Sequence, residues 1–235
     1  RKPSSVRAVP AAPSPVRPSP TGEGLRPSGA AAPPAPGAAR ASDAEDWPAA
    51  AKSALMTCPD YFPLRDGSRW VYVDSLSGGR NMRLEVSLSR SSAAVSAAGA
   101  YFAGRKRFKE YSRSYEREDW VLWEKEASGE RTPILRYPYH EGLSWQARRG
   151  GRLYTYRIAK ARVPVSVKAG AFPDCLKIKS EAEGEAAWVF DYYCPGVGRV
   201  KTTVGVPEGE NPNTELAESS LLSGALRGST GSPVK

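Results

Sequence analysis

The sequence has few of the residue types from which metal and cofactor sites are usually built. Its 235 residues contain one histidine, His140, and three cysteines that stand far apart, so no zinc-ligand spacing occurs. It has no Walker A loop, and its glycines are scattered over turns instead of forming a dinucleotide-binding pattern. No run of about eighteen apolar residues occurs, so we expect no transmembrane helix within these residues. We expect neither a metal nor a cofactor.

Large apolar side chains are nearly missing from the first 46 residues, which hold ten of the 21 prolines. Such a segment cannot bury enough surface to offset its chain entropy. We therefore predict that residues 1–46 are a disordered linker rich in Pro, Ala and Ser. Residues 47–58 are compatible with a short helix, residues 59–222 are predicted to form a single antiparallel β-domain, and residues 223–235 a flexible tail.

From residue 59 onward, apolar and polar residues alternate with the two-residue period of β-strands. Short strands separated by turns every eight to twelve residues or so indicate a mainly β fold. We predict an antiparallel sandwich or a curved, partly closed barrel, with residues 207–213 as a loop. The aromatic residues expected in the core are Trp70, Tyr72, Trp145, Trp188 and Phe190.

Four pieces of this domain stand in a characteristic order: YFPLRDGSRWVY at 61–72, YPYHEGLSW at 137–145, VPVSVKAGAFPDCLKI at 163–178 and YYCPGVGRVK at 192–201. In order and spacing the chain resembles a loose group of secreted or lipid-anchored bacterial β-domain proteins, largely uncharacterised. The resemblance covers roughly residues 59 to 206. It implies an extracytoplasmic location, in the periplasm, at the cell envelope or secreted, and it supplies no catalytic residues. The shape it implies is loosely like that of lipoprotein-carrier half-barrels.

The cysteines Cys58, Cys175 and Cys194 allow one disulfide in three pairings. A hairpin centred on Gly184 and Glu185 places Cys175 opposite Cys194, and we favour this bond. The predicted core conflicts with that register, because Leu176 and Trp188 can share a face only if the register shifts by one residue. A bond from Cys58 to either partner and three free thiols therefore remain alternatives.

The predicted domain is basic, since residues 59 to 206 hold 25 Lys or Arg against 17 Asp or Glu. Basic and aromatic residues interleave over residues 104–118, as in single-stranded nucleic-acid binders. A solvated outer sheet face, carrying Tyr111, Arg113, Tyr115 and Arg117, explains the same pattern and is the favoured interpretation. The residues expected to contact an anionic surface are Arg105, Lys106, Arg107, Lys109, Arg148, Arg149 and Arg152.

No sequence pattern points to catalysis. His140 stands beside Glu141, but neighbours on a strand point to opposite faces, and no nucleophile motif such as Gly-x-Ser-x-Gly is present. We predict a non-enzymatic exported bacterial envelope protein whose β-domain binds an anionic envelope polymer, a lipid or another envelope protein. One alternative is a periplasmic carrier of a lipid or other apolar ligand, and a second is nucleic-acid binding through residues 104–118.

Overall fold

The computed structural model describes residues 58–91 and 94–223, and these form twelve strands and one short helix. The expected linker, most of the expected helix at 47–58 and nearly all of the expected tail lie outside the described residues. Among the described residues, no helix is long and apolar enough to span a membrane. The elements are β1 Arg69–Asp74, β2 Arg83–Ser91, β3 Ala94–Ala103, β4 Lys106–Glu118, β5 Val121–Glu126, β6 Arg131–Arg136, β7 Ser144–Arg149, β8 Arg152–Val167, β9 Gly170–Ala182, β10 Trp188–Cys194, β11 Gly198–Val206, β12 Gly209–Ser219 and α2 Ser220–Ser223.

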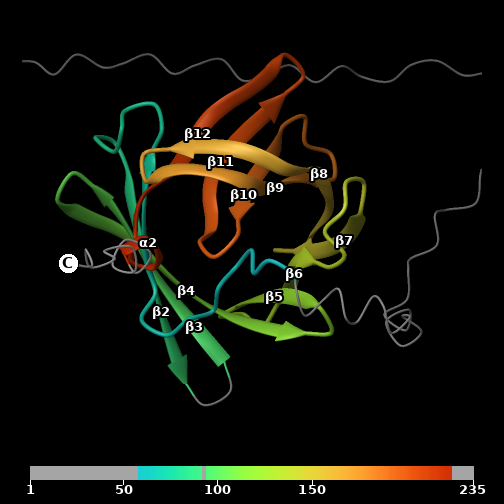
Figure 1. Cartoon of the computed structure of the whole chain (residues 1–235), viewed down its shortest axis with the longest axis horizontal. Helices are drawn as coiled ribbons and strands as arrows, with labels where there is room; N and C mark the ends of the chain where they lie inside the picture. Colours follow the sequence, from blue (N-terminus) through green and yellow to red (C-terminus); the bar gives the residue numbers. More distant parts are fainter. Residues whose placement is uncertain (1–57, 92–93, 224–235) are drawn as a thin grey trace, which may run out of the picture. The chain divides into compact units, whose positions relative to one another are not determined.

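The twelve strands form one antiparallel sheet in the order β6-β5-β4-β3-β2-β1-β12-β11-β10-β9-β8-β7. The sheet curls until β6 and β7 face each other, so the domain is a nearly closed barrel (Figure 1). Side chains bridge this seam, where the Trp145 indole N–H donates to the Pro133 carbonyl at 2.8 Å. The predicted β class is confirmed, and of the two predicted architectures the structure has the partly closed barrel.

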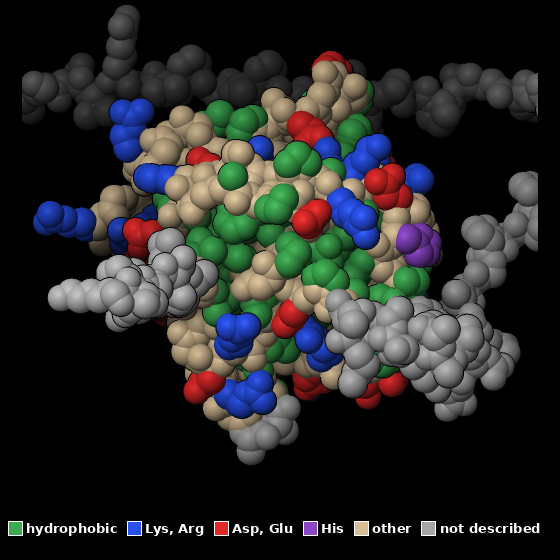
Figure 2. Space-filling model, viewed as in Figure 1, with side chains coloured by type: hydrophobic (Ala, Val, Ile, Leu, Met, Phe, Trp, Pro, Cys, Tyr) green, Lys and Arg blue, Asp and Glu red, His purple; other side chains and the backbone are tan. Residues whose placement is uncertain are grey.

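The segment from residue 58 to residue 68 crosses one opening of the barrel before β1 begins (Figure 1). The Gly196 backbone N–H donates to the Asp60 carbonyl at 2.8 Å. Arg117 at the end of β4 donates to the carboxylate of Asp60 at 2.8 Å and to the carbonyl of Phe62 at 3.0 Å. These contacts tie the segment to opposite sides of the barrel. Figure 2 shows hydrophobic side chains filling the middle of the ring of strands on this face.

The core is built from the alternating inward residues of the strands. Trp70, Tyr72 and Trp145 are buried, as the alternation predicts. The indole N–H of Trp70 donates to the carbonyl of Val197 at 2.7 Å, which satisfies a polar group that burial would otherwise leave unpaired. Trp145 stacks on Tyr156 with ring centroids 5.6 Å apart.

The prediction that Trp188 and Phe190 belong to the core is wrong. Residue 188 pairs with residue 181 and residue 193 with Leu176, so it is Tyr193 that shares the inner face with Leu176. Trp188 and Phe190 lie on the outer face, half-buried, under the ammonium groups of Lys179 and Lys177 at 4.2 and 4.0 Å from the ring centroids. Aliphatic lysine stems and cation–π contacts shelter these rings without placing them inside.

The predicted loop at 207–213 is also wrong beyond its first two residues. β12 begins at Gly209 and pairs with β11 up to Val206, so only residues 207–208 make the turn. Pro212 fits within this strand at a point where the ladder with β11 shifts register. The short helix α2 follows β12 directly.

Candidate functional site

The hairpin tip between β3 and β4 carries four exposed cationic side chains (Arg105, Lys106, Arg107 and Lys109). Gly104, with φ of +57°, supplies the left-handed turn that joins the strands. Arg107 pairs with Glu110. The other three cations form no ion pair within the described part of the chain. We call residues 104–109 the basic tip.

An exposed aromatic ring stands within the basic tip. Tyr101 pairs with Lys109 and Phe102 with Arg107, so Phe108 is the extra residue of a β-bulge. Its side chain is 56% exposed, with its ring centroid 6.1 Å from that of Tyr101. A single exposed apolar side chain is ordinary on a protein surface, so what distinguishes Phe108 is its position among four exposed cations.

The rest of this stretch turns inward, which corrects the predicted outer face. Tyr115 is buried, Tyr111 is partly buried over Gly99, and Arg113 reaches the buried carboxylate of Glu124 at 2.9 Å. A Cβ at Gly99 would lie 2.2 Å from the Tyr111 ring, so this glycine makes room for the ring. Neither tyrosine is available to stack on nucleic-acid bases.

The second predicted basic group lies at the β7–β8 tip, which Figure 1 shows on the opposite side of the barrel from the basic tip. Arg148 and Arg152 are exposed there, and Arg152 pairs with Glu185. The expectation that Arg149 contacts an anionic surface is wrong, because its guanidinium points inward and pairs with Glu124 at 2.8 Å. The predicted contact residues therefore do not form one continuous surface.

A network of charges occupies the barrel interior around Glu124. This carboxylate is buried and accepts hydrogen bonds from Arg113, Arg149 and the Tyr115 hydroxyl, the last at 3.1 Å. Arg149 also donates to Glu126 at 3.4 Å. Sequence reasoning missed this network, since only the closed barrel brings β4, β5 and β7 together around one carboxylate.

A second interior pair joins Arg199 to Asp191 at 3.5 Å, and Thr202 donates to the same carboxylate at 2.7 Å. Burial, the largest single effect, would lower the pKa of Arg199, but Asp191 together with the nearby tyrosines outweighs it and raises the pKa well above its ordinary value. Burial raises the pKa of Tyr72 to about 12, against the lowering effect of Arg199. The interior is therefore filled by neutral tyrosines and charges that compensate one another.

The structure joins Cys175 to Cys194, with a Cα–Cα distance of 4.2 Å, and leaves Cys58 as a free thiol. The paired residues lie at matching positions on β9 and β10, as the hairpin argument required. The competing argument depended on Trp188 being in the core. With Trp188 outside, the conflict disappears.

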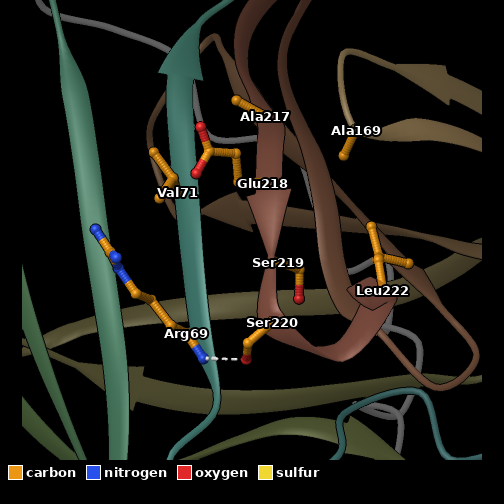
Figure 3. A pocket seen from close by; sticks show the side chains of 8 residues that line it. All are labelled: Arg69, Val71, Ala169, Ala217, Glu218, Ser219, Ser220 and Leu222. Carbon is orange, nitrogen blue, oxygen red and sulfur yellow. Dashed lines mark hydrogen bonds between the residues drawn. The ribbon is translucent and has the colours of Figure 1, made fainter. Parts of the chain in front are cut away.

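Two depressions adjoin on the outer side of the sheet. One, of about 400 Å³, lies between β1, β12 and α2, where the backbone N–H of Arg69 donates to the Ser220 hydroxyl at 2.9 Å (Figure 3). The other, of about 570 Å³, shares Arg69 and is lined by Glu85, Arg107 and Glu110. The arginines pair with the carboxylates, so these depressions do not present an excess of either charge.

His140 and Glu141 make separate contacts. The imidazole Nδ1 of His140 lies 3.0 Å from the Glu141 carbonyl, whereas the Glu141 carboxylate accepts from the Ala161 backbone N–H at 3.2 Å. Among the described residues, no group of three or more His, Cys, Asp or Glu side chains is placed to hold a metal ion.

No family profile and no curated protein matches this chain. Two solved structures are similar to it. A crystal structure described as a "putative lipoprotein" from Parabacteroides distasonis is 15% identical, with a TM-score of 0.43, over 69% of this chain and 99% of that one. A second crystal structure, described as a "putative exported protein" with a YmcC-like fold from Bacteroides fragilis, is 13% identical, with a TM-score of 0.46, over 69% of this chain and 100% of that one.

Proposed function

We propose that this chain is an extracytoplasmic, non-enzymatic binding protein that docks onto an anionic lipid surface through the basic tip and the neighbouring β1–β2 loop. The observation that carries the proposal is the basic tip, where Arg105, Lys106 and Lys109 are exposed around the exposed ring of Phe108 and form no ion pair with any other described residue. Aromatic rings favour the headgroup region of a bilayer, and cations favour its phosphates.

A second exposed apolar residue supports a lipid surface over a polymer. Leu76, in the loop between β1 and β2, is 79% exposed. Because β1 to β4 are consecutive antiparallel neighbours, the β1–β2 and β3–β4 loops emerge at the same end of the sheet. Leu76 and Phe108 could therefore enter the same bilayer surface together.

The Cys175–Cys194 disulfide supports the extracytoplasmic location, because disulfides persist in oxidising compartments and are rare in reducing ones. Cell fractionation of the full-length protein tests this part of the proposal. Recovery in the cytoplasm, with both cysteines reduced, would contradict it.

Vesicle co-sedimentation tests the binding surface. The triple variant Arg105→Glu, Lys106→Glu, Lys109→Glu should bind phosphatidylglycerol vesicles at least about a hundredfold more weakly than the wild type, since each cation contributes roughly 1 kcal/mol near an anionic membrane. The matched control reverses three exposed cations elsewhere: Lys125→Glu, Arg157→Glu and Lys160→Glu.

Both triple variants change the net charge equally, so equal losses would show that only overall charge matters and would refute a specific tip. The double variant Leu76→Ser, Phe108→Ser should weaken binding without changing its salt dependence. Wild-type protein that does not sediment with phosphatidylglycerol vesicles would also refute the proposal.

The two alternatives receive less support. An apolar ligand could enter the barrel only by displacing side chains that contact one another, such as Trp145 and Tyr156. Nucleic-acid binding loses its stacking platform, because Tyr111 and Tyr115 face the interior. The buried carboxylate of Glu124 is paired with two arginines, so it is not free to act as a general acid or base. The proposal therefore assigns no reaction to the domain.

A further inference from the structure

A small cavity of about 110 Å³ lies where the segment at residues 58–60 meets the β4–β5 turn and the loop between β6 and β7. Three aromatic side chains line it, Trp120, Tyr137 and Tyr139, together with Asp60 and Arg117. At roughly 30 Å³ per water molecule, its volume corresponds to about four waters. The cavity is separate from the basic tip and from the interior charges.

The rings form a continuous series. The centroid of Trp120 lies 6.4 Å from that of Tyr137, and the centroid of Tyr137 lies 5.6 Å from that of Tyr139. Tyr139 in turn contacts Tyr61 of the barrel-crossing segment, edge to face, at 5.1 Å. The inner end of the series is anchored in the core by buried Tyr61, whereas the outer end, Trp120, is 46% exposed.

Trp120 holds an unfavourable backbone conformation to present this ring. Its φ is +62°, following Asp119 at +47°, which is the geometry of a two-residue hairpin turn usually made by Asn-Gly or Gly-Gly. A bulky residue in this region is strained, and such strain tends to occur at functional sites. The exposed indole is not part of the core, so packing alone does not account for the strain.

The polar wall of the cavity is an ion pair that carries no net charge. Arg117 and Asp60 lie 2.8 Å apart, and their side chains are 50% and 43% exposed. Within the described part of the chain, the second carboxylate oxygen of Asp60 accepts no hydrogen bond. The pair therefore offers both donors and an acceptor to a ligand, while Arg117 disfavours a cationic one.

We propose that the exposed indole of Trp120, beside this cavity, binds a neutral sugar ring of an oligosaccharide, and that hydroxyl groups of the sugar, not its whole ring, enter the cavity. The C–H face of a pyranose packs on the electron-rich face of an indole, and its hydroxyls would pair with Asp60 and Arg117 in the cavity. This site is independent of lipid docking, because Trp120 and the basic tip lie at opposite ends of β4.

Isothermal titration of the full chain with cellohexaose, maltohexaose and chitotetraose, at up to millimolar concentrations, tests the proposal. At least one should bind saturably. Trp120→Gly should weaken that binding by roughly tenfold or more, while the melting temperature stays equal or rises, because glycine adopts positive φ without strain. Phe108→Gly, the matched loss of another exposed ring, should leave sugar binding unchanged.

Three outcomes would overturn the proposal: no oligosaccharide binds the wild type, Trp120→Gly binds as tightly as the wild type, or choline binds in preference to the sugars. The last would show that the aromatic rings form a cage for a quaternary ammonium group. Because the Phe108 variant and the tip variants keep the cavity, failure of lipid docking and failure of sugar binding are distinguishable.

Discussion

Replacing Glu124 with glutamine should destabilise the barrel more than any exposed charge substitution. The variant leaves Arg113 and Arg149, whose side chains are 29% and 30% exposed, without the carboxylate that they share. Removing one partner of a buried ion pair costs about 3–5 kcal/mol. Because both arginines reach some water and Arg149 keeps Glu126 at 3.4 Å, we expect the lower end, about 3 kcal/mol.

Urea unfolding followed by tryptophan fluorescence measures this loss, which is roughly a hundredfold change in the ratio of folded to unfolded protein. The control is Glu110→Gln, whose side chain is 59% exposed and pairs with Arg107, and it should change the free energy of unfolding by less than about 0.5 kcal/mol. If Glu124→Gln stayed within about 1 kcal/mol of the wild type, the interior charges would not be acting as a desolvated network.

Three further predictions follow from local contacts. Reduction of the Cys175–Cys194 bond, which spans a sequence separation of 19, should lower the free energy of unfolding by about 3 kcal/mol in urea titrations with and without reductant. Gly99→Ala should lower the melting temperature, with a loss of about 2 kcal/mol, because its Cβ would lie 2.2 Å from the Tyr111 ring. Burial alone would raise the pKa of Glu210, but hydrogen bonds from its lysine, threonine and tyrosine partners outweigh it and lower the pKa below 4.5. Its contribution is therefore present at neutral pH, and the stability difference between wild type and Glu210→Gln should shrink as the pH falls below 4.5.

Alternation in the sequence indicated the β class but did not show which face of each strand is inside. On β10 the aromatic residues Trp188 and Phe190 have the larger apolar area, yet Tyr193 is the buried one. The face was decided by the β9 partner strand, whose Lys177 and Lys179 cover the outer rings. A cross-strand cation–π contact depends on register, and a single strand pattern does not contain it.

On β4 the opposite error occurs, because side chains predicted to lie on the outer face of the sheet lie on the inner face. Its arginines and tyrosines resemble a solvated face, but Arg113 and Tyr115 point inward, where both contact Glu124 of the neighbouring strand β5. The exposed cations of the basic tip were predictable, since a hairpin tip is solvated whatever the curvature of the sheet. The cavity beside Trp120 was not predictable, because Asp60, Trp120 and Tyr139 meet only after the barrel forms.

The order of the strands sets when this domain can finish folding. The first strand, β1, is hydrogen-bonded on one side to the last, β12, and Trp70 lies opposite Ser219. Two runs of consecutive hairpins, β1 to β6 and β7 to β12, can each form locally. They can pair with each other through β1 and β12 only after the final residues of the domain have been synthesised. A chain still emerging from the ribosome therefore holds two half-sheets with exposed edges, and any truncation before β12 would leave them unjoined.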